Sequence, residues 1–415
     1  MEELDRLLNN ATDPDTGILH GAAFILIDRS GKTIYKKSSG SSSTDLNNAS
    51  ALDMNSLYWI ASMTKFITAI AAVQLIEQGV LDLDSDVRAR VEELRDVKVL
   101  KGMDSDQPVY EDLEGCTSSP DVVEGERENG AYVLREYGME GYTHPLLFQP
   151  GKSWGYGSGL DWAGVLIERV TGHSLSTYMQ ENIFSRLGLT SMTFQHPDQH
   201  SLNTTRKLSL LEMVHRVPVP TTNSDHKTRA DTETNHKTSL RPAPITLNYP
   251  LKHPLGGIGL FSTPSDFTSL LSAILRGGND LFVNGEESVK LLLAPQLGAS
   301  PELRKAIPAG MGRMMCTVLG LGLGNAAEGE HALAGAVNMN DIPGRRKAGS
   351  VCWSGFPNTH WWIDQKTGIA GAFFTQLVPP GDRATTALFI ELEKASYKLV
   401  DPIIGLGSGR GDGKL

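Results

Sequence analysis

The sequence predicts an α+β fold in which an antiparallel sheet is built from both ends of the chain and the middle is mostly helical. Strand-like runs occur near the N-terminus, in "AAFILIDRSGKTIYKKSSG", and near the C-terminus, in "SVCWSG" and "THWWIDQKTGIAGAFFTQL". Apolar residues at helical spacing fill several stretches between them. Strands at both ends with helices between favour one domain whose sheet is completed by both termini.

The first expected element is a β-hairpin over residues 22–40. Two strand-like runs are separated there by a short polar stretch, Arg29-Ser30-Gly31-Lys32, which is typical of a hairpin turn. A helix follows over residues 62–78 and ends at Gly79. Its apolar residues cover every side, which indicates a buried helix.

Two more helices are expected in the middle of the chain, over residues 158–172 and 174–188, each ended by a glycine. Residues 101–145 are mixed in composition, with polar residues and scattered glycines, and part of this region is predicted to be a loop. Residues 218–250 are predicted to form an exposed loop. A short strand and a helix follow, the helix capped by Ser or Thr beside Pro264 and ended by Gly277.

The C-terminal strands are followed by a closing helix at "ATTALFIELEKASYKLV". We therefore expect a single domain over residues 1–415. Its sheet part would take about 15–60 and 250–405, and its helical part about 61–250.

The charge balance excludes several classes of partner. The formal net charge is -10 at pH 7 and the pI is near 5.6, with no block rich in Lys or Arg. Nucleic acid and anionic membranes are therefore not expected partners, and a small molecule is. The N-terminal "MEELDRLLNN" lacks the basic and apolar regions of a signal peptide, and no run reaches the roughly 18 apolar residues of a membrane span. We expect a cytoplasmic protein.

No metal site, disulfide framework or cofactor is expected. The three cysteines are odd in number and far apart, and the histidines share no spacing typical of metal ligands. Each cysteine is interpreted as a small buried residue, and each histidine as a surface residue or a satisfied core residue. These residues are Cys116, Cys316 and Cys352, and His20, His144, His173, His253 and His360.

The stretch "YWIASMTKFITAI" places Ser62 and Lys65 one helical turn apart at the start of an apolar helix. Positions i and i+3 share a face, so the lysine nitrogen can reach the serine oxygen. A serine hydroxyl becomes a nucleophile only when a neighbour takes its proton, and burial favours the uncharged lysine that can do so. The alternative is that Ser62 caps the helix and Lys65 reaches solvent.

A second stretch, "PGKSWGYGSGLDWAG", places Tyr156 in a glycine-rich turn just before a helix. Its hydroxyl can be held there in a cleft. The alternative is a tyrosine that packs at an interface beneath the turn.

This order of Ser-x-x-Lys and Tyr-Gly-Ser resembles the serine β-lactamase and penicillin-binding-protein superfamily. Within it, "YGSGLDWAG", "GGIGLFSTPSDF" and "WSGFPNTHWWID" look most like fungal transesterases of the lovastatin acyltransferase type and like family VIII esterases. The resemblance implies a β-lactamase-like fold. It also implies that Ser62 is the acylated nucleophile, Lys65 its partner, and Tyr156 the group that exchanges a proton with the serine or the incoming alcohol.

The resemblance further implies a strand opposite the serine. True β-lactamases carry Lys-Thr-Gly there, and this chain has a literal copy at 366–368, which reads as a hairpin turn with Lys366 in solvent. The matching strand is instead Trp353-Ser354-Gly355, which implies an uncharged ester or thioester substrate. The backbone N–H groups of Ser62 and Phe356 would form the oxyanion hole, at about 3 kcal/mol per donor.

Two tryptophans flank these positions. We expect Trp154 and Trp353 to line an apolar acyl pocket, with Ser354 and Gly355 also at the substrate. One family feature is missing, since the transesterases carry a His-Thr-Ser-Gly loop and no such string occurs between residues 100 and 150. The cleft wall on that side is expected to differ.

The predicted function is transfer of an acyl group from a thioester or ester, through a Ser62 acyl-enzyme, to an alcohol of a small secondary metabolite. A carrier-protein or coenzyme A thioester is the expected donor. The first alternative is a carboxylesterase, in which water replaces the alcohol. The second is a catalytically idle homologue that acts as a binding protein or scaffold.

Overall fold

The computed structural model describes most of the chain. Described residues are 1–45, 47, 49–104, 107–112, 127–128, 131–132, 143–196, 208–218, 238–245, 247, 251, 253–298, 303, 306, 318 and 330–408. Most of the two stretches 101–145 and 218–250, together with Cys116 and Cys316, lies outside them. None of the described helices has the length and apolar character needed to cross a membrane.

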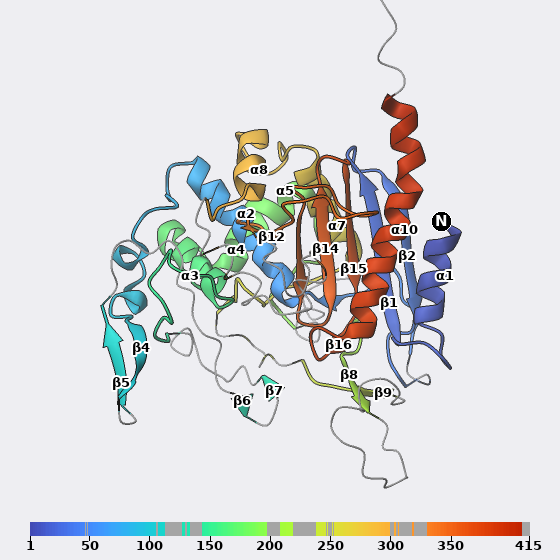
Figure 1. Cartoon of the computed structure of the whole chain (residues 1–415), viewed down its shortest axis with the longest axis horizontal. Coiled ribbons are helices and arrows are strands. Elements are labelled where there is room, and N and C mark those ends of the chain that lie inside the picture. The colour runs from blue at the N-terminus through green and yellow to red at the C-terminus, as the bar shows by residue number, and fades with distance from the viewer. Residues whose placement is uncertain are drawn as a thin grey trace, which may run out of the picture.

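A seven-stranded antiparallel sheet forms the centre of the fold (Figure 1). Its strands, in spatial order, are β11 (Glu330–His331), β12 (Ala336–Val337), β13 (Val351–Gly355), β14 (Thr359–Asp364), β15 (Ile369–Phe374), β1 (Gly21–Asp28) and β2 (Thr33–Gly40). β1 pairs with β15, with Ala23 opposite Phe374. The prediction that both ends of the chain build one sheet is confirmed.

Helices cover both faces of this sheet. The terminal helices α1 (Glu2–Ala11) and α10 (Arg383–Ser408) pack against each other on one face. On the other face α7 (Pro264–Leu275) packs against β1 and β15, and α2 (Thr64–Glu77) lies beside it with α8 (Gly285–Leu293). Because both faces are covered, β1 is buried along nearly its whole length.

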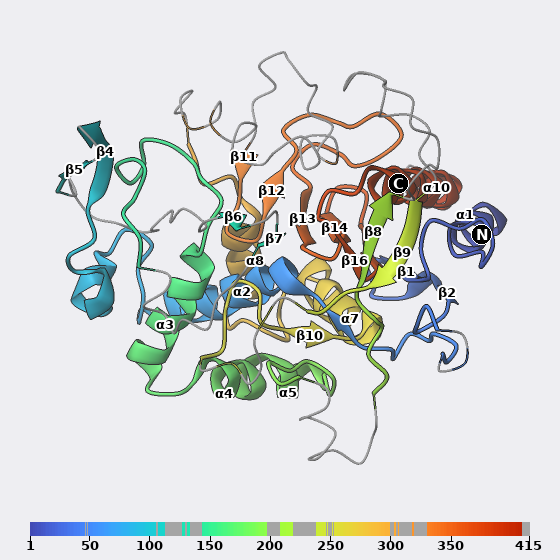
Figure 2. The ribbon, with the colours of Figure 1, turned by 90° about the horizontal axis from the view of Figure 1, so that it is seen from below.

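The remaining helices form a layer beyond α2 and α7 (Figure 2). They are α3 (Gly159–Thr171), α4 (Leu175–Met179), the π-helical turn η5 (Gln180–Phe184) and α5 (Ser185–Leu187). Of the short 3-10 turns, η1 (Ala61–Met63) lies against β13 and β14 of the sheet, whereas η2 (Val87–Ala89) and η3 (Glu92–Leu94) contact each other.

Smaller sheets complete the described part of the chain. Their strands are β3 (Tyr58–Trp59) with β10 (Phe261–Ser262); β16 (Leu377–Val378) with β8 (Val214–Pro218) and β9 (Thr238–Pro242); β4 (Val99–Asp104) with β5 (Gln107–Glu111); and β6 (Arg127–Glu128) with β7 (Ala131–Tyr132).

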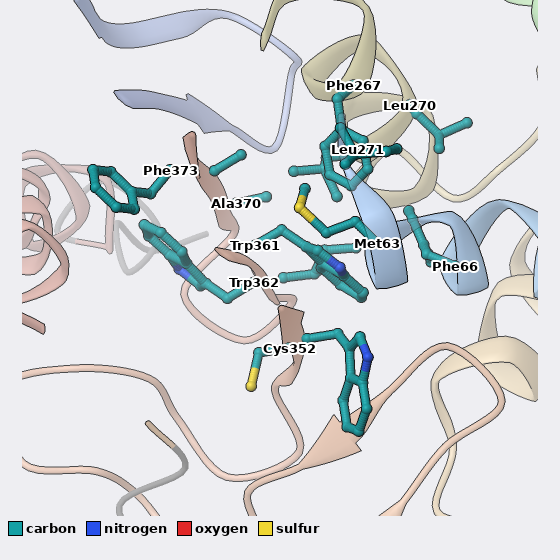
Figure 3. Close-up of a cluster of buried hydrophobic side chains, with 14 of the residues drawn as sticks. Met63, Phe66, Phe267, Leu270, Leu271, Cys352, Trp361, Trp362, Ala370 and Phe373 are labelled. Atoms are coloured by element: carbon teal, nitrogen blue, oxygen red, sulfur yellow. The ribbon is translucent and has the colours of Figure 1, made fainter. Parts of the chain in front are cut away.

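The core beside the sheet is aromatic (Figure 3). Trp361 of β14 lies 4.5 Å, ring centre to ring centre, from Phe66 of α2. Its neighbour Trp362 points to the opposite face and packs at 5.8 Å against Phe389 of α10. Successive residues of a strand point to opposite faces, so "HWWID" serves both layers at once. Strand β14 thereby fixes α2 and α10 to the same sheet.

Most expected elements are confirmed. The hairpin, the buried helix, α3, the helical stretch ended by Gly188, and α7 with its Thr263 cap all appear where predicted. Strand β9 lies inside the stretch 218–250, which was expected to be a loop. The prediction of a loop is therefore wrong for the residues of β9. Helices α1 and α8 and the β4–β5 hairpin were not predicted from the sequence. The division into a sheet part and a helical part stays a prediction.

Stability should fall in mild acid because His360 is buried as a neutral ring. It stacks on Phe389 at 4.4 Å, and burial together with Arg346 and Arg345 lowers its pKa to about 3. The unfolded chain, with a His pKa of about 6.5, then binds more protons than the folded chain between these two values. This contribution is intact above pH 6.5 and is lost progressively as the pH falls towards 3.

Urea unfolding at pH 7 and pH 5 measures the effect. His360→Phe keeps the stacked ring and removes the titration, so its loss of unfolding free energy between the two pH values should be smaller than that of the wild type by about 1–2 kcal/mol. Equal losses in the two proteins would contradict the assignment.

Candidate active site

Ser62 lies in a constrained stretch of backbone. It belongs to η1, and the preceding residue, Ala61, has a φ of 43°, a region that residues with a side chain rarely adopt. Hydrogen bonds hold this stretch, since the Ile60 N–H donates to Leu260 O at 3.0 Å and the Met63 N–H donates to Ile60 O at 3.0 Å. Strain of this kind persists only where the surroundings impose it, and it is concentrated at functional sites.

Two side chains converge on the Ser62 hydroxyl. Tyr156 OH donates to Ser62 Oγ at 2.5 Å, and Lys65 Nζ donates to the same oxygen at 3.3 Å. The Lys65 nitrogen also lies over the Tyr156 ring, 4.7 Å from its centre. Ser62 and Lys65 are each 8% exposed. A serine hydroxyl, a lysine nitrogen and a phenol therefore meet at one place in the structure.

The loop before β10 holds Lys65 in place. Lys65 Nζ donates to Gly257 O at 3.1 Å, and the Gly257 N–H donates to Oδ1 of the buried Asp161 at 2.8 Å. Asp161 lies in the first turn of α3, three residues after Ser158, where a carboxylate is favoured by the helix dipole. The backbone of Gly257 thus links α3 to the lysine of α2.

Two glycines are needed for close backbone approach. A Cβ on Gly257 would lie 2.3 Å from Asp161 Oδ2, so a larger residue would push this loop off Lys65. A Cβ on Gly355 would lie 2.4 Å from Ile60 O and 2.3 Å from Thr359 Oγ1. Gly355 therefore lets β13 lie directly against the turn that carries Ser62.

Aromatic rings line one side of the site. The Trp353 ring lies 5.6 Å from the Tyr156 ring and 5.4 Å from the His331 ring, and His331 lies 5.6 Å from Trp154. Burial lowers the pKa of His331 to about 4, so this imidazole is uncharged near pH 7. The four rings form a continuous row, and the two tryptophans named from the sequence lie in it.

Ser354 lies differently from its neighbours. In the β13–β14 register Trp353 is opposite Trp361 and Ser354 is opposite His360. Directly opposed residues share a face, and His360 packs on α10. The Ser354 side chain therefore lies on the α10 face, and at the site this residue offers backbone groups only.

The two backbone groups expected to form the oxyanion hole come from separate elements. Ser62 lies in η1, and Phe356 begins the turn after β13, with its ring 6.0 Å from that of Trp59. Their joint role stays a prediction. Lys366, in contrast, is exposed in the turn between β14 and β15, as expected for the literal Lys-Thr-Gly copy.

Three residues of this site were missed from the sequence: Asp161, Gly257 and His331. The quoted motifs "YGSGLDWAG" and "GGIGLF" contain the first two, so paired glycines and an acidic residue in a helix's first turn were the available signals. His331 lies in a two-residue strand, and no sequence pattern indicated that it belongs to the site. Across the described residues, no group of three His, Cys, Asp or Glu side chains could hold a metal ion.

The family model described as Beta-lactamase matches residues 9–395 of the chain. An ML-236A carboxylate methylbutanoyltransferase of Penicillium citrinum is 30% identical over 367 residues, which cover 82% of this chain and 80% of that protein. A lovastatin esterase of Penicillium rubens is 28% identical over 89% of this chain and 91% of its own.

The fold has a close counterpart among solved structures. Unliganded simvastatin synthase from Aspergillus terreus superposes with a TM-score of 0.74 at 26% identity, over 95% of this chain and 97% of that chain. The β-lactamase-like fold predicted from the motifs is thereby confirmed.

Gly355 and Lys366 provide a direct test of which strand serves the site. Gly355→Val should lower Ser62-dependent turnover of a short fluorogenic ester by about 100-fold or more, because its side chain would displace β13 from Ile60. Lys366→Ala should leave turnover within about twofold, because this lysine is exposed in a turn. Similar losses of turnover from both changes would contradict the assignment of Trp353-Ser354-Gly355, rather than residues 366–368, to the site.

Proposed function

The chain belongs to the beta-lactamase family, and on this premise we propose that it is a serine acyltransferase. It would move an acyl group from a thioester or ester donor to a hydroxyl of a small secondary metabolite. One observation carries the proposal: Tyr156 OH lies 2.5 Å from Ser62 Oγ, with Lys65 Nζ 3.3 Å from the same oxygen. This is the arrangement that activates a serine for acyl transfer.

In the proposed acylation step the Tyr156–Lys65 pair reacts in the state that carries one proton fewer than a phenol plus an ammonium, so that it can accept a proton. Ser62 Oγ attacks the acyl carbonyl carbon and passes its proton to this pair. A short separation from Tyr156 lets the proton cross without rearrangement. The negative charge on the carbonyl oxygen would be held by the N–H groups of Ser62 and Phe356. Collapse of this intermediate breaks the bond to the leaving thiol or alcohol, which takes a proton from the same pair.

Deacylation repeats these steps in reverse order. An acceptor hydroxyl near Tyr156 gives its proton to the pair and attacks the acyl carbon, and Ser62 regains its proton when the acyl-enzyme bond breaks. Lys65 lies over the Tyr156 ring at 4.7 Å, so its positive charge stabilises negative charge on the phenol oxygen during both transfers. We assign the proton to the pair as a unit, because both groups lie within hydrogen-bond distance of Ser62 Oγ.

The aromatic row supports an uncharged acyl donor. Trp353 takes the place of the lysine of Lys-Thr-Gly, and its neighbours in the row are Tyr156, His331 and Trp154. Such a surface binds an aliphatic acyl chain by burial, at about 0.8 kcal/mol per methylene, and offers nothing to a β-lactam carboxylate. We therefore expect penicillins to be poor substrates.

The relatives support both the leading function and one alternative. The Penicillium citrinum relative is named a methylbutanoyltransferase, which supports transfer of a short acyl group. The lovastatin esterase, 28% identical, favours hydrolysis as the second candidate. An idle binding protein has less support, because Ser62, Lys65 and Tyr156 lie within hydrogen-bond distance. A carrier-protein or coenzyme A thioester as donor and a cytoplasmic location remain parts of the proposal.

The ratio of transfer to hydrolysis tests the proposal. A short acyl thioester is incubated with the protein and a panel of polyketide-like alcohols, and ester and free acid are quantified. We expect ester to exceed acid with at least one alcohol, since a site that excludes water favours a bound acceptor over solvent. Ser62→Ala is the blank and should form neither product above background.

Two results would contradict transfer. Free acid as the sole product across the panel, with rapid turnover of short esters, would replace the transferase with the esterase. Equal activity of Ser62→Ala and the wild type would exclude a serine enzyme of either kind.

A further inference from the structure

The segment 376–382, which we name the brace, contacts both backbone stretches that carry the expected oxyanion donors. On one side, Gln376 Nε2 donates to Trp59 O at 2.9 Å, three residues before Ser62. On the other, the Leu377 N–H donates to Pro357 O at 3.3 Å, one residue after Phe356. The brace thus joins two stretches that are about 300 residues apart in sequence.

Asn358 fixes the second stretch to the brace. Its amide nitrogen donates to Leu377 O at 2.7 Å and to Pro379 O at 2.9 Å. Its amide oxygen accepts from the N–H groups of Gly381 and Asp382, each at 3.0 Å. All four hydrogen bonds that a side-chain amide can commonly make are therefore directed to one short segment.

The backbone of Asn358 contributes as well. It has a φ of 59°, and its N–H donates to Gly355 O at 3.0 Å, which closes the turn containing Phe356. Asparagine tolerates this left-handed conformation better than other residues with side chains. Both Asn358, at 1% exposure, and Gln376, at 0%, are buried, so their hydrogen bonds are shielded from water.

The brace is itself anchored on both sides. The Val214 N–H of β8 donates to Gln376 O at 2.9 Å. Asp382 is paired with Arg216 at 2.6 Å and caps the start of α10 through the Thr385 N–H at 2.9 Å. Because the brace is held at both of its ends, it can keep the turn containing Phe356 in a fixed position.

We propose that Asn358 and Gln376 are positioning residues for acyl transfer, which hold the N–H groups of Phe356 and Ser62 at a fixed separation around the developing oxyanion. The inference rests on the proposed function. Neither side chain touches the reacting atoms. Each acts through the backbone stretch that it binds, and loss of either lets the separation between the two N–H groups vary.

Matched variants separate this role from plain stabilisation. Asn358→Gly keeps the left-handed backbone and removes the four side-chain hydrogen bonds, and its control is Asn338→Gly, whose amide donates to Asn340 O and Lys347 O in the loop after β12. Gln376→Met removes the bond to Trp59, and its control is Gln74→Met, whose amide joins Asn182 O and Leu281 O near the far end of α2.

The readout is turnover of an ester and of its thionoester, in which sulfur replaces the carbonyl oxygen. Sulfur is a poor hydrogen-bond acceptor, so the oxygen-to-sulfur rate ratio reports hydrogen bonding in the oxyanion hole. Asn358→Gly and Gln376→Met should each lower kcat for the oxygen ester about ten- to hundredfold with KM within about threefold. The rate ratio should fall by about tenfold in both, and stay unchanged in the two controls.

Other outcomes overturn the proposal. A ratio unchanged in both variants, with kcat kept or lowered equally for the two esters, would make the brace purely structural. If Asn358→Gly does not fold, the Gln376→Met ratio decides alone. Wild-type protein without any Ser62-dependent turnover would overturn the proposed function and this inference together, and that failure is recognised because it occurs before any variant is compared.

Discussion

The structure of the site depends on one close contact between two backbones. Gly355 of β13 lies so near Ile60 that a Cβ would approach its carbonyl oxygen to 2.4 Å. This contact brings the C-terminal end of β13 against η1, where Ala61 is held at a φ of 43° and Ser62 follows. The same strand carries Trp353 of the aromatic row and leads into the turn containing Phe356. Ser62, just before α2, therefore faces groups that come from the opposite end of the chain.

The second determinant is the set of hydrogen bonds that the buried Lys65 side chain makes. Lys65 is 8% exposed, and an ammonium removed from water is costly unless oxygen atoms surround it. Ser62 Oγ and Gly257 O supply two of these, and the Tyr156 ring face lies above the charge. Asp161 holds Gly257 in turn. The same contacts that make the lysine tolerable in the core also place it where it can assist proton transfer.

The sequence was sufficient for the parts that depend on local pattern. The hairpin, the buried helix from Ser62, and the helix after Tyr156 follow from periodicity and glycine positions, and the sheet follows from strand-like runs at both ends. The grouping of Ser62, Lys65 and Tyr156 needed the family resemblance, because nothing in the spacing of 94 residues between serine and tyrosine brings them together. His331, Gln376 and Asn358 could not be found this way, since their importance lies in contacts between distant segments. Ser354 was expected at the substrate from its place in the motif. Only the strand register reveals that its side chain lies on the other face of the sheet.

Covalent trapping tests the central claim that Ser62 carries the acyl group. The wild-type protein is mixed briefly with a short acyl thioester in the absence of an alcohol, quenched in acid, and its intact mass and peptide masses are measured. The account predicts one added acyl group, located on the peptide that contains Ser62, with no adduct in Ser62→Ala. An adduct on another residue, or turnover of the thioester with an equal amount of adduct in Ser62→Ala, would contradict it.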